Sequence, residues 1–208
     1  MRHLLRVYRL VMVLVFAHAL TACGWAGRKA EPGVSSPETQ LANRAADPSI
    51  YGLDLALTGE DGRTRALADL RGRVLVAAMM YTSCTSVCPR VVDDMRGIER
   101  QLSVRDHQAI EFVLFSLDAG RDTPMALRQF AMEHGVAASN WRLFAASADG
   151  VRELSAVLGV KYKAQEDGEI GHSAMIFVID REGVVRHRQI GINQDLHGLT
   201  AALALIRR

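Results

Sequence analysis

The segment Val74-Leu-Val-Ala-Ala-Met-Met-Tyr81-Thr-Ser-Cys84-Thr-Ser-Val-Cys88-Pro89 is the most informative part of this chain for its fold. The nearly continuous apolar run before Thr82 is typical of a strand that is buried on both faces of a sheet. Pro89 favours the first turn of a helix, and apolar residues recur at roughly helical spacing to Leu102. The segment therefore predicts a buried strand, a short loop with two cysteines, and a helix.

Strands and helices alternate on both sides of this segment. Upstream, residues 51–57 and 64–67 flank a turn at Glu60–Arg63, which predicts a hairpin. Downstream, apolar patterns and turn residues predict strand 110–118, helix 124–134, strand 141–145, helix 149–158, strands 174–180 and 184–190, and helix 195–206. This order predicts an α/β fold, a thioredoxin-like layer sandwich with a central mixed sheet flanked by helices and an N-terminal β-hairpin.

The first residues have the features of an export signal. Arg2, Arg6 and Arg9 precede an apolar run at 10–20 that is short for a membrane span. Leu20-Thr-Ala-Cys23 resembles the lipobox of bacterial lipoproteins, in which the cysteine becomes the lipidated N-terminus. An ordinary cleaved signal or an uncleaved anchor would indicate the same compartment. We expect an extracytoplasmic, membrane-anchored protein, on the periplasmic side in a Gram-negative bacterium.

These features predict three regions. Residues 1–22 form the signal peptide, residues 23–48 hold the lipidated Cys23 and a flexible tether, and residues 49–208 form one domain. The composition, 49% hydrophobic and 23% charged, is ordinary for a globular protein. The formal net charge of +2 comes without a basic stripe, so nothing indicates a nucleic-acid partner.

The cysteines indicate chemistry. If Cys23 carries lipid, the remaining thiols are Cys84 and Cys88, with three residues between them. A disulfide this local closes too short a loop to stabilise a fold much. In an oxidising compartment the pair is therefore redox-active, metal-bound, or both. The start of a helix favours the thiolate form, and residues four apart in a helical turn point both sulfurs to one side.

His172 is the candidate third ligand. It lies in Asp167-Gly-Glu-Ile-Gly-His172-Ser, just before a long apolar strand, and in a thioredoxin-like sheet this segment faces the cysteine-bearing helix. Thioredoxins have a cis-proline there, whereas this chain has none of its five prolines nearby. Two thiolates and an imidazole suit Cu(I), an added oxygen suits Cu(II), and zinc usually takes a fourth protein ligand. Asp118 ends a strand near this site, where it orients a ligand or shapes a turn with Arg121 and Thr123.

Several motifs in order resemble the Sco/SenC family of copper chaperones for cytochrome oxidase assembly. The resemblance covers about residues 50–200 and rests on Asp61-Gly-Arg, Leu67-Ala-Asp-Leu-Arg-Gly72, the segment 81–89, Phe115-Ser-Leu-Asp118, Arg121-Asp-Thr-Pro124, Trp141 and Gly171-His-Ser173. It implies that Cys84, Cys88 and His172 bind Cu(I) or Cu(II). It also implies that the copper passes to the binuclear copper site of cytochrome c oxidase.

Two departures from the family pattern lie beside the expected site. Thr85-Ser86 stands where the family often has Pro-Asp, and Ala119 stands where it often has proline. The lost acid removes a negative charge, which is expected to alter Cu(II) affinity or thiol reactivity. We expect a metallochaperone rather than an enzyme. The alternative is a thiol–disulfide oxidoreductase that reduces the copper-ligand cysteines of its partner.

Overall fold

The computed structural model of the chain describes residues 48–138 and 140–206. All of them belong to the unit Glu38–Arg208. The predicted signal peptide, Cys23 and the tether up to residue 47 lie outside the described residues. Within the described ranges, no helix combines the length and the apolar composition that a membrane crossing requires.

A seven-stranded mixed sheet forms the centre of the fold, as predicted. Its strand order is β2-β1-β5-β4-β3-β8-β9. Strands β3, β4 and β5 run parallel, whereas the other neighbours pair antiparallel. The strands are β1 (Ala56–Gly59), β2 (Thr64–Ala66), β3 (Val74–Met80), β4 (Ile110–Ser116), β5 (Trp141–Ala145), β8 (Met175–Ile179) and β9 (Val185–Ile190). Strands β6 (Tyr162–Ala164) and β7 (Ile170–His172) form a separate hairpin.

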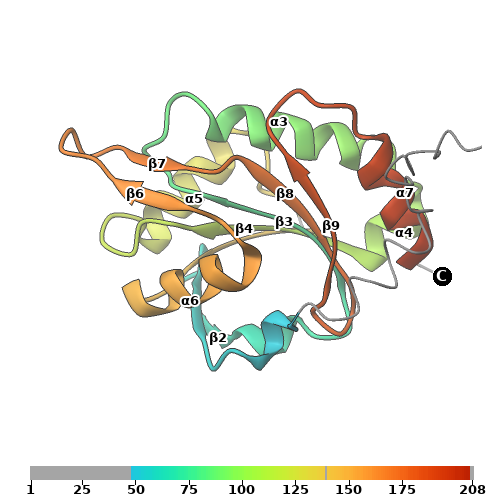
Figure 1. Cartoon of the computed structure of the whole chain (residues 1–208), viewed down its shortest axis with the longest axis horizontal. Helices are drawn as coiled ribbons and strands as arrows, with labels where there is room; N and C mark the ends of the chain where they lie inside the picture. Colours follow the sequence, from blue (N-terminus) through green and yellow to red (C-terminus); the bar gives the residue numbers. More distant parts are fainter. Residues whose placement is uncertain (1–47, 139, 207–208) are drawn as a thin grey trace, which may run out of the picture. The chain divides into compact units, whose positions relative to one another are not determined.

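Helices cover both faces of this sheet. Figure 1 shows α3 on one side and α6 on the other. The helices are α3 (Cys88–Glu99), α4 (Val104–Ala109), α5 (Pro124–Glu133), α6 (Ala148–Leu158) and α7 (His197–Ile206), with short 3₁₀ turns η2 (Ile50–Gly52) and η3 (Leu67–Leu70). Every residue of β3 and β4 is buried between them. The layered, thioredoxin-like architecture expected from the sequence is therefore confirmed, since apolar runs such as 74–80 need cover on both faces.

Three local predictions differ from the structure. The expected strand at 51–57 begins as η2, which Ser49 caps by accepting the N–H of Tyr51. Helix α4 was not expected, because its six residues have no apolar periodicity and rely on a capping box between Ser103 and Asp106. The hairpin β6–β7 was not predicted, because its strands are short and mostly polar.

The topology brings three distant segments to one edge of the sheet. Met80 at the end of β3 pairs with Ser116 at the end of parallel β4. Because β8 is antiparallel to β3, Ile176 near its start lies beside Ala78. The segments that follow β3 and β4 and the segment that precedes β8 therefore meet at the same edge.

Candidate metal centre

A seven-residue turn at 81–87 links β3 to α3 and carries Cys84. The helix begins at Cys88, with Pro89 in its first turn as predicted. Cys84 lies outside the helix, so the expectation that one helical turn aligns both thiols is wrong. Instead, the turn folds back, and the N–H of Cys88 donates to Sγ of Cys84 at 3.3 Å.

His172 completes a compact group of three potential ligands. Its Nε2 lies 3.6 Å from Sγ of Cys88, and the ligand atoms of Cys84, Cys88 and His172 all lie within 4.8 Å of one another. The Nδ1 atom lies 3.2 Å from the carbonyl oxygen of Ser173. A proton on Nδ1 that donates to this carbonyl leaves the lone pair of Nε2 facing the thiols. The predicted convergence of these three side chains is therefore present.

The surroundings of His172 favour its neutral form. Burial lowers the pKa of the imidazole, and the hydrogen bond to the Ser173 carbonyl opposes this effect only in part. A neutral imidazole is the form that ligates metals. The imidazole thus presents an available lone pair beside two sulfur atoms, a set that suits a soft ion.

The two thiols have opposite electrostatic environments. Both are free and buried, Cys84 with 5% and Cys88 with 0% of its surface exposed. For Cys84, burial raises the pKa, but the thiol of Cys88 and the N–H groups at 86–88 stabilise the thiolate, so that the pKa is lowered overall. For Cys88, burial and the neighbouring Cys84 raise the pKa well above its usual value. Cys84 is the more readily ionised thiol.

This asymmetry predicts selective alkylation. In the metal-free reduced protein at pH 7, iodoacetamide should modify Cys84 at least about 10-fold faster than Cys88, because each unit of pKa changes the thiolate fraction tenfold. Peptide mass spectrometry over time measures both rates, and the unfolded protein serves as the control in which the rates become similar. Faster modification of Cys88 in the folded protein would contradict the assigned environments.

Asp118 shapes the loop after β4. Its carboxylate accepts the N–H groups of Gly120 and Arg121, at 3.2 and 3.0 Å, and pairs with the Arg121 guanidinium. Nη2 of Arg121 in turn donates to the carbonyl of Gly168 at 2.7 Å, in the hairpin that carries His172. Asp118 therefore shapes a turn, which is one of the two roles considered from the sequence. It is linked to the hairpin through Arg121.

Asp122 is the carboxylate that contacts the cysteine turn, and sequence reasoning did not single it out. It is 4% exposed and accepts the hydroxyls of Thr82 and Ser116, both at 2.6 Å, and the N–H of Thr82. Burial raises its pKa, while the hydrogen bonds from Ser116 and Thr82 oppose that rise. The sequence feature that could have identified Asp122 is its position in Arg121-Asp-Thr-Pro124, directly before Thr123, the N-cap of α5.

Removing this carboxylate should weaken the fold at the site. Asp122→Ala leaves the buried hydroxyl of Ser116 and the half-buried donors of Thr82 without their acceptor, so we expect a loss of about 2–4 kcal/mol in the free energy of unfolding. Asp149→Ala is the matched control: its side chain is 74% exposed and pairs with Arg152, so its loss should stay within about 1 kcal/mol. Urea denaturation measures both, and equal stability of the two variants would rule out the anchoring role.

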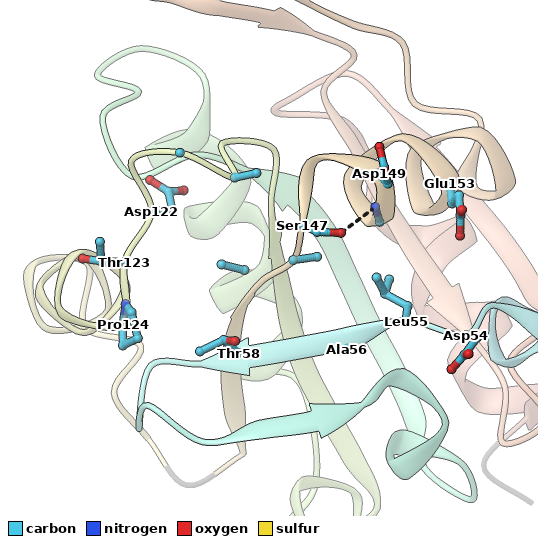
Figure 2. Close-up of a pocket in the computed structure, with 15 residues that line it drawn as sticks. Asp54, Leu55, Ala56, Thr58, Asp122, Thr123, Pro124, Ser147, Asp149 and Glu153 are labelled. Carbon is cyan, nitrogen blue, oxygen red and sulfur yellow. Dashed lines mark hydrogen bonds between the residues drawn. The ribbon is translucent and has the colours of Figure 1, made fainter.

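A separate pocket of about 590 Å³ lies behind this loop and contains none of the three candidate ligands. Figure 2 shows Asp122 and Thr123 on one wall and Ser147 and Asp149 on another. The first turns of α5 and α6 both line it, together with residues of β1. Asp122 therefore contacts both this pocket and the cysteine turn, but neither thiol lines the pocket.

Comparisons with known proteins agree with this geometry. The SCO1/SenC family model matches residues 43–204. An SCO1 protein homolog from Bacillus subtilis is 22% identical over 67% of this chain and 74% of its own length. The chain spans 65% and 48% of the lengths of two other curated relatives.

Two solved structures share the fold. A SCO1/SenC family lipoprotein from Bacillus anthracis superposes with a TM-score of 0.67 at 26% identity, covering 75% of this chain and 95% of that one. ScoI from Arabidopsis thaliana, solved with copper bound, superposes with a TM-score of 0.61 at 21% identity, covering 73% of this chain and 95% of that one.

Proposed function

The chain belongs to the SCO1/SenC family, and we propose that it is an extracytoplasmic copper metallochaperone. Copper is its cargo, held by Sγ of Cys84, Sγ of Cys88 and Nε2 of His172. The observation that carries this function is the meeting of these three atoms within 4.8 Å at one edge of the sheet. Two thiolates and an imidazole are a donor set that favours copper over hard cations.

Both copper oxidation states fit this donor set. The two sulfurs satisfy the soft Cu(I) ion, and the imidazole with an added oxygen makes the set suitable for Cu(II). A structural zinc site would normally have four protein ligands, and the described residues bring only these three together. The shortage of ligands suits a carrier, because an open coordination position lets an acceptor ligand enter before the carrier's ligands leave.

Transfer to a partner requires that the site reach the surface. His172 is half-buried, and it lines a shallow depression of about 350 Å³ together with Lys161–Lys163, Gly171 and Ser173. Thr85 and Ser86, between the cysteines, are exposed. The acceptor we propose, following the family resemblance, is the binuclear copper site of a cytochrome c oxidase subunit, which takes the ion by stepwise ligand exchange.

A transfer assay tests this function. The Cu(I)-loaded protein is mixed with a soluble copper-binding domain of the oxidase, and the copper content of each is measured after separation. We expect net transfer from the wild-type protein, and no loading by the Cys84→Ser variant. A wild-type protein that binds copper but never releases it to the acceptor would contradict the chaperone role and would indicate copper storage instead.

We propose that Asp118 supports this site from outside the ligand set. It fixes Arg121, which donates to Gly168 in the hairpin that carries His172. Outer partners of this kind commonly tune a metal site by orienting its ligands.

We also propose that lipid on Cys23 anchors the protein to a membrane. The lipobox-like Leu20-Thr-Ala-Cys23 supports this anchor, and a relative of the same fold is described as a lipoprotein. Several acyl chains on one cysteine suffice for stable anchoring. Intact-mass measurement of the membrane-extracted protein is expected to show a diacylglycerol-modified N-terminus that Cys23→Ser lacks.

The unequal thiols favour a second function, reduction of disulfides. Cys84, with its lowered pKa, would attack a partner disulfide, and Cys88 would then close the Cys84–Cys88 disulfide. The two electrons and two protons of the dithiol leave the partner with two thiols. This activity needs no imidazole, so it should survive His172→Ala, whereas tight Cu(II) binding should not.

A further inference from the structure

The hairpin β6–β7 carries His172 but lies outside the main sheet, because the sheet pairings described for its strands join them only to each other. Contacts with other segments must therefore hold it against the cysteine turn. One is the bond from Arg121 to the Gly168 carbonyl. Another is a hydrogen bond of 2.5 Å from the hydroxyl of Tyr81 to Oε2 of Glu169.

Tyr81 contacts several parts of the site at once. It directly follows β3 and is 2% exposed. Its ring meets the His172 ring edge to face, with centroids 5.9 Å apart and an interplanar angle of 80°. Its hydroxyl also interacts with the backbone of Ile170 and with the thiol of Cys84. The same side chain thus contacts the cysteine turn, the hairpin and the imidazole.

We propose that Tyr81 and Glu169 are positioning residues that hold His172 within reach of the copper ion. Glu169 fixes the Tyr81 hydroxyl, and the fixed ring supports the imidazole from its edge, so that Nε2 faces the two thiols. This inference rests on the proposed copper-binding function. Outer groups that orient a ligand commonly contribute 10–100-fold to metal affinity.

Of these two hydrogen bonds, the one between Tyr81 and Glu169 should contribute more to holding the hairpin in place. The Arg121 side chain is 49% exposed, and water can replace its bond to Gly168 at small cost. The Tyr81 hydroxyl belongs to a buried side chain, where a hydrogen bond to a carboxylate is strengthened by the lower local polarity. Loss of the Tyr81–Glu169 hydrogen bond also frees the Tyr81 ring, which packs against the imidazole of His172.

Four single variants of the full protein and the double variant Tyr81→Phe/Glu169→Ala test the pair. Tyr81→Phe keeps the ring and removes the hydroxyl, whereas Glu169→Ala removes the acceptor. Glu169→Gln keeps an oxygen that can accept the same hydrogen bond, so it should rescue the loss. Tyr51→Phe makes the same chemical change on a buried tyrosine outside the site, whose hydroxyl donates to the Leu70 carbonyl at 2.9 Å, and serves as the matched control.

Two measurements are made on each variant. Competition with a chelator gives the Cu(II) affinity, and we expect a loss of about 10-fold for Tyr81→Phe and for Glu169→Ala. The double variant should lose no more than either single one, because both remove the same bond. Amide hydrogen exchange of the metal-free protein should accelerate at residues 162–172 in these variants. Glu169→Gln and Tyr51→Phe should match the wild type in both measurements.

The outcomes separate this inference from the proposed function. Unchanged affinity and exchange in Tyr81→Phe and Glu169→Ala would overturn the inference, as would additive losses in the double variant. If Tyr81→Phe does not fold, Glu169→Ala alone decides, because its side chain is half-buried. A wild-type protein that binds no copper would overturn the proposed function, while the exchange data would still show whether the pair fixes the hairpin.

Discussion

Replacing Cys88 with serine should abolish tight copper binding in both oxidation states. Sγ of Cys88 lies next to Nε2 of His172, and its own N–H holds Sγ of Cys84. A serine hydroxyl is a hard donor that stays protonated at neutral pH, so it cannot replace a thiolate for Cu(I). Since outer-shell groups alone contribute 10–100-fold, loss of a ligand should weaken binding by at least about 100-fold.

The measurement is a competition titration of Cu(I) under anaerobic conditions. Ser83→Ala is the matched control, because Ser83 is exposed in the same turn. The control should bind within about threefold of the wild type, and the melting temperature of Cys88→Ser should show that it is folded. A folded Cys88→Ser variant with wild-type Cu(I) affinity would remove Cys88 from the ligand set.

Replacing His172 with alanine should separate the two oxidation states. Cu(II) loses its only nitrogen donor among the three side chains, so we expect at least about a 100-fold loss of affinity. Cu(I) keeps both thiolates and should lose about 10-fold. The electron paramagnetic resonance spectrum of the Cu(II) form should lose the coupling to the imidazole nitrogen.

His197→Ala is the control for this variant, because His197 is exposed at the start of α7. The pH dependence adds a second check. Burial holds the pKa of His172 below its ordinary value, so protons should compete with Cu(II) for the imidazole nitrogen only at a pH below the range usual for histidine. A His172→Ala protein with an unchanged Cu(II) affinity and spectrum would show that the imidazole binds no copper.

The main sheet could be predicted because its central strands are long apolar runs. Buried segments such as 74–80 and 110–116 have one plausible place in an α/β fold, between covering helices. The fold class then places the ends of these strands at a common edge. For that reason the sequence also predicted that His172, about 84 residues after Cys88, lies beside it.

The details of the site depend on contacts that a sequence pattern does not record. Cys84 lies before the helix because the chain turns back on itself at 81–87, and only the folded turn shows its sulfur accepting the N–H of Cys88. Of two carboxylates four residues apart, Asp118 faces its own loop and Asp122 faces the cysteine turn. Their order in the chain does not distinguish them, because the direction of each side chain is set by tertiary packing.

The hairpin β6–β7 was missed for a related reason. Its strands have three residues each and little apolar surface, so neither length nor periodicity marks them. Gly168 adopts a left-handed conformation at its turn, with φ of 84°. The hairpin is recognisable only through its partners, the Tyr81 hydroxyl and the Arg121 guanidinium, which come from distant parts of the chain.

X-ray absorption at the copper edge, on reduced protein loaded with Cu(I), tests the central claim most directly. The account predicts one copper ion per chain, surrounded by two sulfur atoms and one imidazole nitrogen. The nitrogen should disappear in His172→Ala, whereas Cys84→Ser and Cys88→Ser should retain no copper after loading. A wild-type protein that binds no copper, or a copper ion without sulfur ligands, would contradict the account.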